Sequence, residues 1–371
     1  YNVFYTQLDN FDSTPQGWRK LINHLEKEYV NEFKFSFEHI EEWIKKSLVT
    51  IKYGNNQTSF ESAVDEYQST KVLIKSLGIN FEDAAILYSS FATKTFTSDY
   101  FIKFTSEDSK NMKFTVFHSA ARKFIEFIEI LSNVPISFTN IEFLVDYKLE
   151  DGKRLPLIKG KYFLQHARKF EKWKENSQKN ISLSDLDDNF ELILNNWYEK
   201  TEKLEFIVRQ FSKNLHGDLY LEDQLVDAIK NLEVYSRGFQ KFCVRQNLTD
   251  SEKQSREAIY KFIDEFIYEA DKKKFKNKLS FNSRTPNLFE RLEKIFDSID
   301  ESNKNKIFHK IIDKNLFIKK LVQTRNYHTH GDSKKKYPYM ITSINEMYET
   351  KVLLQEVLRY FIYKELGMEY Q

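Results

Sequence analysis

The sequence predicts a helix-dominated protein with an α+β N-terminal half and an all-helical C-terminal bundle. Three observations predict it. Stretches rich in aromatic and β-branched residues lie in the first half, the helical period dominates from about residue 188 onward, and Gly and Pro number 9 and 5 in 371 residues. Few glycines and prolines favour long regular elements. A chain of this length can bury two cores, and we place the boundaries at 1–187, 188–216 and 217–371.

The N-terminal part, residues 1–187, alternates between strand-like and helix-like segments. The expected strands are 95–105, 112–117 and 136–147. Between the last two lies HSAARKFIEFIEILSNVP, whose apolar residues recur at helical spacing before a proline, so we expect a helix there. The segment DGKRLP at 151–156 is typical of a turn. We therefore predict that residues 1–187 form an α+β domain.

Helical periodicity continues to the C-terminus after a connecting helix at 188–216. The helices expected beyond it are 219–243, 252–275, a short one after Pro286, one from Asn305 to about Thr329 with a break near Asp313–Asn315, and 340–366, ending at Gly367. In the segment 252–275, Ile259, Phe262, Ile263, Phe266 and Ile267 share one face. We expect this amphipathic face and that of 340–366 to supply apolar surface for packing or self-association.

Composition excludes several classes of protein. The net charge of +2 is too balanced for a protein that binds nucleic acid with its whole surface, so any such contact must be a local patch. The single cysteine, Cys243, excludes an internal disulfide and a cysteine metal cluster. No run approaches the roughly 18 apolar residues of a membrane span, and no signal peptide is recognisable, so we expect a cytoplasmic protein.

The candidate catalytic residues lie in one segment, LVQTRNYHTHGD, residues 321–332. No phosphate-binding loop, dinucleotide fingerprint, zinc-protease motif or serine-hydrolase elbow occurs, and we expect no metal site and no cofactor. In this segment Arg325 and His330 stand five positions apart near the expected end of a helix. Two other arginine–histidine pairs, at 19/24 and 209/216, lie on amphipathic segments and are typical of helix surface.

The residues around this pair resemble a known signature. The string TRNYHTH followed by Gly-Asp resembles the signature of the HEPN superfamily in its Apea-like branch, and NLEVYSRGF at 231–239 resembles that branch's Leu-Glu-x-Tyr-x-Arg string. The two strings occur in the order that the family shows. The segment FKFSFEHIEEWI at 33–44 and the strand–helix–strand pattern around 100–147 look like the ApeA-type N-terminal domain that accompanies it.

The resemblance implies an RNA endonuclease used in bacterial antiphage defence by abortive infection. It implies that Arg325, Asn326 and His330 are catalytic, with RNA (tRNA among the candidates) as substrate, a phage-derived trigger, and a homodimer or higher homo-oligomer as the active form. Glu233 is a candidate to hold Arg325 in place. His328 is a second imidazole in the motif, and if it faced the pocket the assignment of the base would change.

The chemistry is consistent with these residues. RNA carries its own nucleophile, the 2′-OH, so a base or acid that titrates near neutrality and a guanidinium that meets the phosphate charge are a sufficient minimum. Five residues along a helix separate two side chains by about 140°. Arg325 and His330 therefore converge better if His330 lies beyond the helix end, or if two protomers bring both pairs to a shared cleft.

Ordinary structural roles compete with these interpretations. Lys334, Lys335 and Lys336 could contact phosphates, but such runs are more often solvated loops. Tyr327 could stack on a base or pack in the core. The alternative function is a non-catalytic helical sensor that binds a phage product or a nucleotide. Retention of the arginine, asparagine and histidine together argues against a decayed enzyme.

Overall fold

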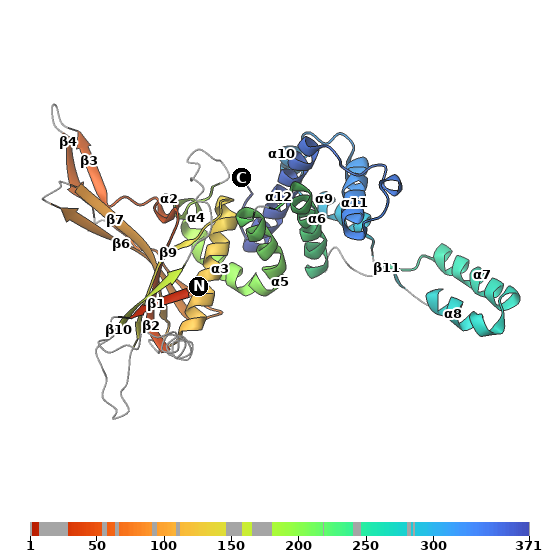
Figure 1. The fold of residues 1–371 in the computed structure, drawn as a ribbon, viewed down its shortest axis with the longest axis horizontal. Coiled ribbons are helices and arrows are strands. Elements are labelled where there is room, and N and C mark those ends of the chain that lie inside the picture. Colours follow the sequence, from red (N-terminus) through yellow and green to blue (C-terminus); the bar gives the residue numbers. More distant parts are fainter. Residues whose placement is uncertain are drawn as a thin grey trace, which may run out of the picture. The chain divides into compact units, whose positions relative to one another are not determined.

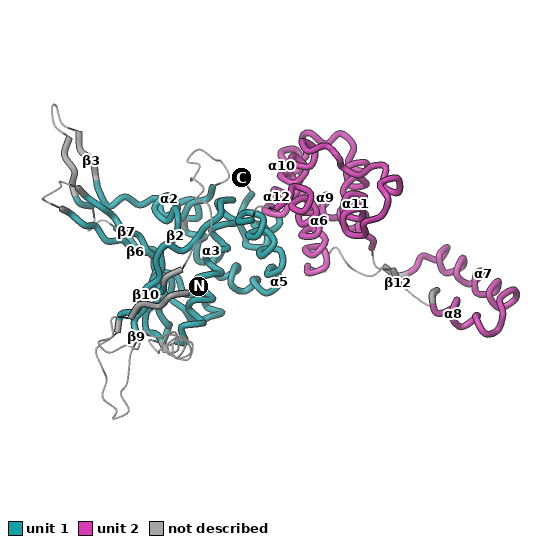
Figure 2. The backbone as a smooth tube through the Cα atoms, in the orientation of Figure 1, with its two compact units in different colours: residues 1–218, 361–371 teal, residues 219–360 magenta. Residues whose placement is uncertain are grey.

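The chain forms two compact units in a computed structural model (Figures 1 and 2). The structure describes residues 2–6, 29–53, 58–63, 67–90, 95–108, 112–145, 158–164, 180–217, 219–239, 246–279, 283–284 and 286–370. The first unit comprises residues 1–218 and 361–371, and the second comprises residues 219–360. The turn expected at 151–156 and Cys243 lie outside the described residues.

The first unit is built on an antiparallel sheet of eight strands. Its order is β1-β10-β9-β2-β7-β6-β5, and β8 pairs with β2. The strands are β1 (Asn2–Thr6), β2 (Tyr29–Phe37), β5 (Lys71–Ile74), β6 (Ile79–Ser90), β7 (Thr95–Ser106), β8 (Met112–Lys113), β9 (Phe138–Val145) and β10 (Ile158–Leu164). A separate ribbon pairs β3 (Val49–Tyr53) with β4 (Thr58–Ser62). The strands expected at 95–105 and 136–147 correspond to β7 and β9.

Aromatic rings fill the core of this unit. Alternation along β2 buries Phe33, Phe35 and Phe37 on one face of the sheet. The ring of Phe35 meets that of Phe124 from the covering helix edge-on, at a centroid distance of 5.9 Å. Trp43 on α2 (Ile40–Ile44) is fully buried against the same phenylalanine. The high phenylalanine content thus serves packing.

Two long helices cover the sheet. α3 (Phe114–Ser132) packs on β2, and α5 (Phe190–His216), which follows the short α4 (Leu183–Leu186), packs along α3 (Figure 1). Trp197 Nε1 and Tyr198 Oη of α5 donate to backbone oxygens of α3, at 2.9 and 2.8 Å. The helix expected at 188–216 is therefore α5, and it belongs to the first unit.

The strand expected at 112–117 is wrong beyond its first two residues. The strand β8 ends at Lys113 and α3 begins at Phe114, so the predicted helix starts four residues earlier than its sequence limits. Phe114 and Phe117 are buried and continue the helical stripe to Phe124. Packing of this stripe outweighs the strand preference of the aromatic residues.

The second unit is helical. Its elements are α6 (Leu221–Gly238), β11 (Gln246–Asn247), α7 (Asp250–Phe266), α8 (Glu269–Leu279), β12 (Ser283–Arg284), α9 (Leu288–Asp297), α10 (Glu301–Ile307), α11 (Lys314–His330), the 3₁₀ turn η3 (Lys334–Lys336) and α12 (Ile344–Leu366), whose last turn falls in the first unit. Helices α6, α9 and α11 pack on one another. Buried Leu232, Ile295 and Leu321, one from each helix, contribute to this core. An α+β part followed by an all-helical bundle is the predicted fold class, which is confirmed.

The single helix expected at 252–275 is wrong. The chain forms a hairpin of α7 and α8, because Ile267 leaves the helix in an extended conformation with φ −100° and ψ 140°. β11 and β12 pair at the two ends of this hairpin. Of the expected apolar face, Ile263 is buried, whereas Ile259, Phe262 and Phe266 are exposed. The break expected near Asp313–Asn315 is present, since α10 ends at Ile307 and α11 begins at Lys314.

Candidate active site

The helix α11 carries the arginine–histidine motif in its last two turns. Asp313 caps its start, since the carboxylate accepts a hydrogen bond from the backbone N–H of Leu316 at 2.9 Å. Gly331 ends it in the left-handed conformation with φ +65°, which suits a glycine. His330 is therefore the last helical residue. The alternative in which it lies beyond the helix end does not hold.

An apolar stripe sets the direction in which Arg325 points. The buried Ile318 and Leu321 precede it by seven and four positions, so Arg325 extends their face of α11 toward the bundle. Its side chain is 22% exposed. His330 is exposed and lies about 140° around the helix axis from Arg325. Within one chain the two side chains therefore diverge.

His328 is closer in angle to Arg325 than His330 is. It stands three residues after the arginine, about 60° around the axis, and is exposed. The ring of Tyr327, which is half-buried, meets the rings of His328 and Tyr337 edge-on, with centroid distances of 5.1 and 6.2 Å. Tyr327 thus contributes to the packing at the end of α11.

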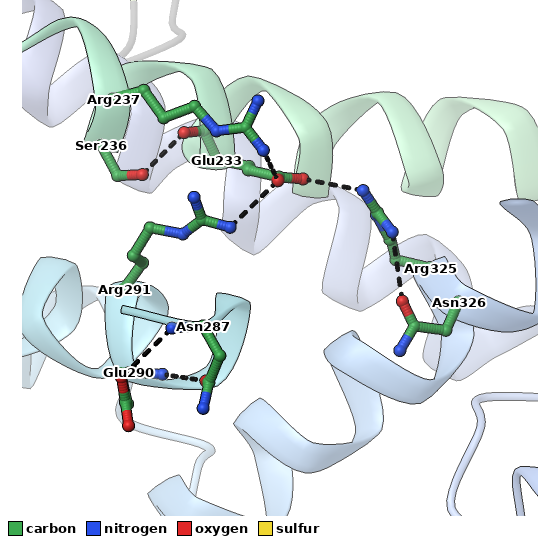
Figure 3. Close-up of polar contacts among 8 residues, drawn as sticks. All are labelled: Glu233, Ser236, Arg237, Asn287, Glu290, Arg291, Arg325 and Asn326. Atoms are coloured by element: carbon green, nitrogen blue, oxygen red, sulfur yellow. Dashed lines mark hydrogen bonds and ion pairs between the residues drawn. The ribbon is translucent and has the colours of Figure 1, made fainter. Parts of the chain in front are cut away.

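Glu233 of α6 lies at the centre of the polar contacts around Arg325 (Figure 3). Its side chain is 7% exposed, and Oε2 accepts from Nη2 of Arg325 at 3.2 Å. The other oxygen, Oε1, accepts from Arg291 of α9 at 3.1 Å and from Arg237 of α6. One buried carboxylate thus joins arginines from the three packed helices.

Asn326 contacts Arg325 directly. Its Oδ1 accepts from Nη1 of Arg325 at 3.2 Å, so the guanidinium is engaged by Asn326 on one nitrogen and by Glu233 on another. The Nε groups of Arg325 and Arg291 are buried without a hydrogen-bond acceptor among the described residues. The arginines therefore retain donors that an incoming anion could occupy after a side-chain adjustment.

The segment after α11 carries the three lysines of the motif's C-terminal flank. Lys336 and Tyr337 donate to Oδ2 of Asp332 at 2.6 and 2.8 Å. These hydrogen bonds, of which the one from Lys336 has the larger effect, lower the pKa of Asp332, and the electrostatic influence of nearby His330 acts in the same direction. Lys334 and Lys335 are exposed in η3. An ionised carboxylate therefore stands close to His330.

Comparison with known families identifies both parts of the chain. The family model of Apea-like HEPN matches residues 226–371, and that of ApeA N-terminal domain 1 matches residues 18–197. Together the two matches cover most of the chain, and its C-terminal part is an Apea-like HEPN domain. The resemblance deduced from the two sequence strings is thereby confirmed. No curated protein and no solved structure matches the chain.

The Apea-like HEPN segment contains the entire cluster around Glu233. It begins at Val226 in α6 and includes α9 and α11, which supply Arg291 and Arg325. In the ranges that the structure describes, no three His, Cys, Asp or Glu side chains form a group that could hold a metal ion. Nor does any helix there have the length and apolarity needed to cross a membrane.

Sequence reasoning assigned no site role to two of the three arginines, although Arg237 is the arginine of the recognised Leu-Glu-x-Tyr-x-Arg string. Arg237 was within reach of prediction, because it follows Glu233 by four positions on one helix and such pairs are neighbours. Arg291 carries no comparable signal. It follows Glu233 by 58 positions and lies on a strongly amphipathic helix, where nothing in the local pattern indicates a buried ion pair.

Proposed function

We propose that this Apea-like HEPN protein is an endoribonuclease of bacterial antiphage defence that acts by abortive infection. The family suggests an antiphage defence nuclease. The observation that carries the proposal is the Arg325 guanidinium, oriented by buried Glu233 and by Asn326 at the end of the helix that also carries His330. A substrate made of RNA would place the activity in the cytoplasm.

In the proposed reaction the 2′-OH oxygen attacks the adjacent phosphorus. The P–O2′ bond forms, the P–O5′ bond breaks, and the products are a 2′,3′-cyclic phosphate and a 5′-OH. A base removes the 2′-OH proton and an acid gives one to the leaving O5′. Imidazole suits both steps, and we assign them to His330. Arg325 stabilises the charge that gathers on the non-bridging oxygens.

We infer further that two protomers complete the site. Arg325 faces the bundle whereas His330 faces outward on the same helix, so one chain does not bring both to one phosphate. A two-fold interface across the ends of two α11 helices would bring together two arginines and two histidines without new residues. Asn326 precedes His330 by four positions and would hold Arg325 on the phosphate.

The test is cleavage of total RNA by the purified chain in the presence of EDTA. We expect fragments that end in 2′,3′-cyclic phosphate, detected by their resistance to ligation until the ends are opened and dephosphorylated. Loss of cleavage in EDTA with recovery on adding Mg²⁺ would contradict the mechanism. Binding of a nucleotide or phage product with no cleavage of any RNA would favour the sensor instead.

A further inference from the structure

We propose that Arg237 is a second phosphate-binding residue, which holds the phosphate next to the scissile one in a single-stranded substrate. This inference rests on the proposed function and adds a substrate contact to it. Arg237 lies in the last turn of α6 and donates to Glu233 Oε1, while Arg325 donates to Oε2 of the same carboxylate (Figure 3). The two guanidinium groups thus pair with the two different oxygens of one carboxylate.

The cluster of Arg237, Arg291, Arg325 and Glu233 has a net positive charge, which attracts polyanions. Three arginines share the single negative charge of Glu233, so two positive charges remain. Within the part of the chain that the structure describes, Glu233 is the carboxylate that all three pair with. A residual charge of this size next to a catalytic arginine favours binding of successive phosphates.

The three arginines differ in the exposed fraction of their side chains, and this difference suggests different roles. Arg291 has a side chain that is 9% exposed, so its pairing with Glu233 takes place away from water and is screened least of the three. Arg237 is 57% exposed, and a solvent-screened pair of this kind is weak. We therefore assign Arg291 to positioning Glu233. The guanidinium of Arg237 can exchange part of its contact with Glu233 for a phosphate oxygen at little cost.

The chain contains a matched control. On α5, Arg209 pairs with Glu205 at the same spacing of four residues, and its side chain is 71% exposed. It belongs to the first unit, and among the described residues no second arginine pairs with Glu205. Replacement of Arg209 thus removes an exposed, glutamate-paired arginine of equal charge without touching the proposed site.

The experiment measures binding of a fluorescein-labelled single-stranded RNA, and of a DNA of the same sequence, to the full chain carrying His330→Ala. In this background we expect Arg237→Ala to raise Kd about tenfold, the effect of one lost charge-assisted hydrogen bond. The slope of log K against log salt should become shallower by about 0.7, because one phosphate contact is lost from a single strand. RNA and DNA should be affected alike, since a phosphate contact does not read the sugar.

Two further variants complete the test. Arg237→Lys should keep most of the salt slope, because the charge remains, and Arg209→Ala should bind like its parent. Equal Kd values and salt slopes for Arg237→Ala and Arg209→Ala would overturn the inference. RNA cleavage by the wild-type chain, with that equality, would overturn the inference and leave the proposed function intact. The expected salt slopes in the His330→Ala background, together with no RNA cleavage by the wild-type chain, would overturn the proposed function. They would still support phosphate binding by Arg237.

Discussion

Arg325 and His330 differ in environment although they are only five positions apart on one helix. The arginine continues the buried stripe of Ile318 and Leu321 and so meets Glu233, whereas the histidine lies on the far side of α11 in solvent. Helix geometry, not loop flexibility, sets this divergence. The proposed acid–base group thus lies on a surface that a second copy of the chain could approach.

His328 provides the sharpest residue-level prediction. We expect His328→Ala to retain most of the cleavage rate, because the signature places the catalytic imidazole at His330. His328 is nevertheless the nearer of the two in angle to Arg325. The measurement is the initial rate of RNA cleavage by both alanine variants. An inactive His328→Ala with an active His330→Ala would show that the other imidazole is the catalytic one.

Glu233 provides a prediction about positioning. Glu233→Gln should keep the shape of the side chain but lose the charge that orients Arg325, so we expect cleavage to slow by about 10²-fold. The rate of cleavage at saturating RNA measures this, with Glu205→Gln, the exposed partner of Arg209, as the control. Wild-type cleavage by Glu233→Gln would mean that the phosphate itself suffices to orient the arginine.

At the residue scale the sequence identified the motif but not its surroundings. Glu233 and Arg325 belong to two strings that were recognisable, and the fold brings them within 3.2 Å. Arg291 could not be found in the same way, because a buried arginine on an amphipathic helix has no local signature and its partner is distant in the sequence. Ion pairs between helices depend on packing that local periodicity does not encode.

The element that positions Arg291 is α9, which begins with a reciprocal cap. The side chain of Asn287 accepts from Glu290 N–H at 3.0 Å, and Glu290 accepts from the backbone N–H of Asn287 at 3.1 Å. Such a cap fixes the first turn, from which Arg291 reaches Glu233. Because Arg291 and Arg325 donate to the same carboxylate, loosening the first turn of α9 would disturb the group that orients Arg325.

Asn287→Ala should lower the free energy of unfolding of the bundle by about 1 kcal/mol and also slow cleavage, because the first turn of α9 loosens. Urea unfolding and the cleavage rate measure the two effects. Thr249→Ala is a matched control, since Thr249 forms the same kind of capping box with Glu252 at the start of α7, away from the arginine cluster. An equal effect of both variants on cleavage would argue against a specific role for α9.

Sequence periodicity located most elements and failed where two rules competed. Residues 114–117 are aromatic and β-branched, yet they form the start of α3 because Phe114 and Phe117 face the sheet. The break between α7 and α8 at Ile267–Tyr268 has no glycine or proline to mark it. The helix terminus that matters most, at Gly331, was signalled by its glycine and by the following polar segment.

For the whole molecule, the structure gives a helical bundle with one copy of the motif and an outward-facing His330. Self-association is therefore the feature on which activity depends in our account. The apolar surface available for it includes Ile259, Phe262 and Phe266 of α7, which are exposed in the single chain. The face of α12 is a poorer candidate, because Leu354, Leu358 and Phe361 are buried.

We expect light scattering at micromolar concentration to give at least twice the 44.6 kDa mass of the chain. Mixing Arg325→Ala with His330→Ala should restore partial cleavage, because one intact pair would then be divided between two chains. A monomer that cleaves RNA at the full rate would exclude the shared site and leave a single-chain mechanism.

Cleavage kinetics can decide whether Arg325 and His330 form the catalytic pair of an endoribonuclease. Single-turnover cleavage of RNA in EDTA is compared for the wild-type chain, Arg325→Ala and His330→Ala, each checked for an unchanged thermal unfolding midpoint. We predict that each substitution lowers the rate by about 10²- to 10⁴-fold. Folded variants that both cleave at the wild-type rate would contradict the account.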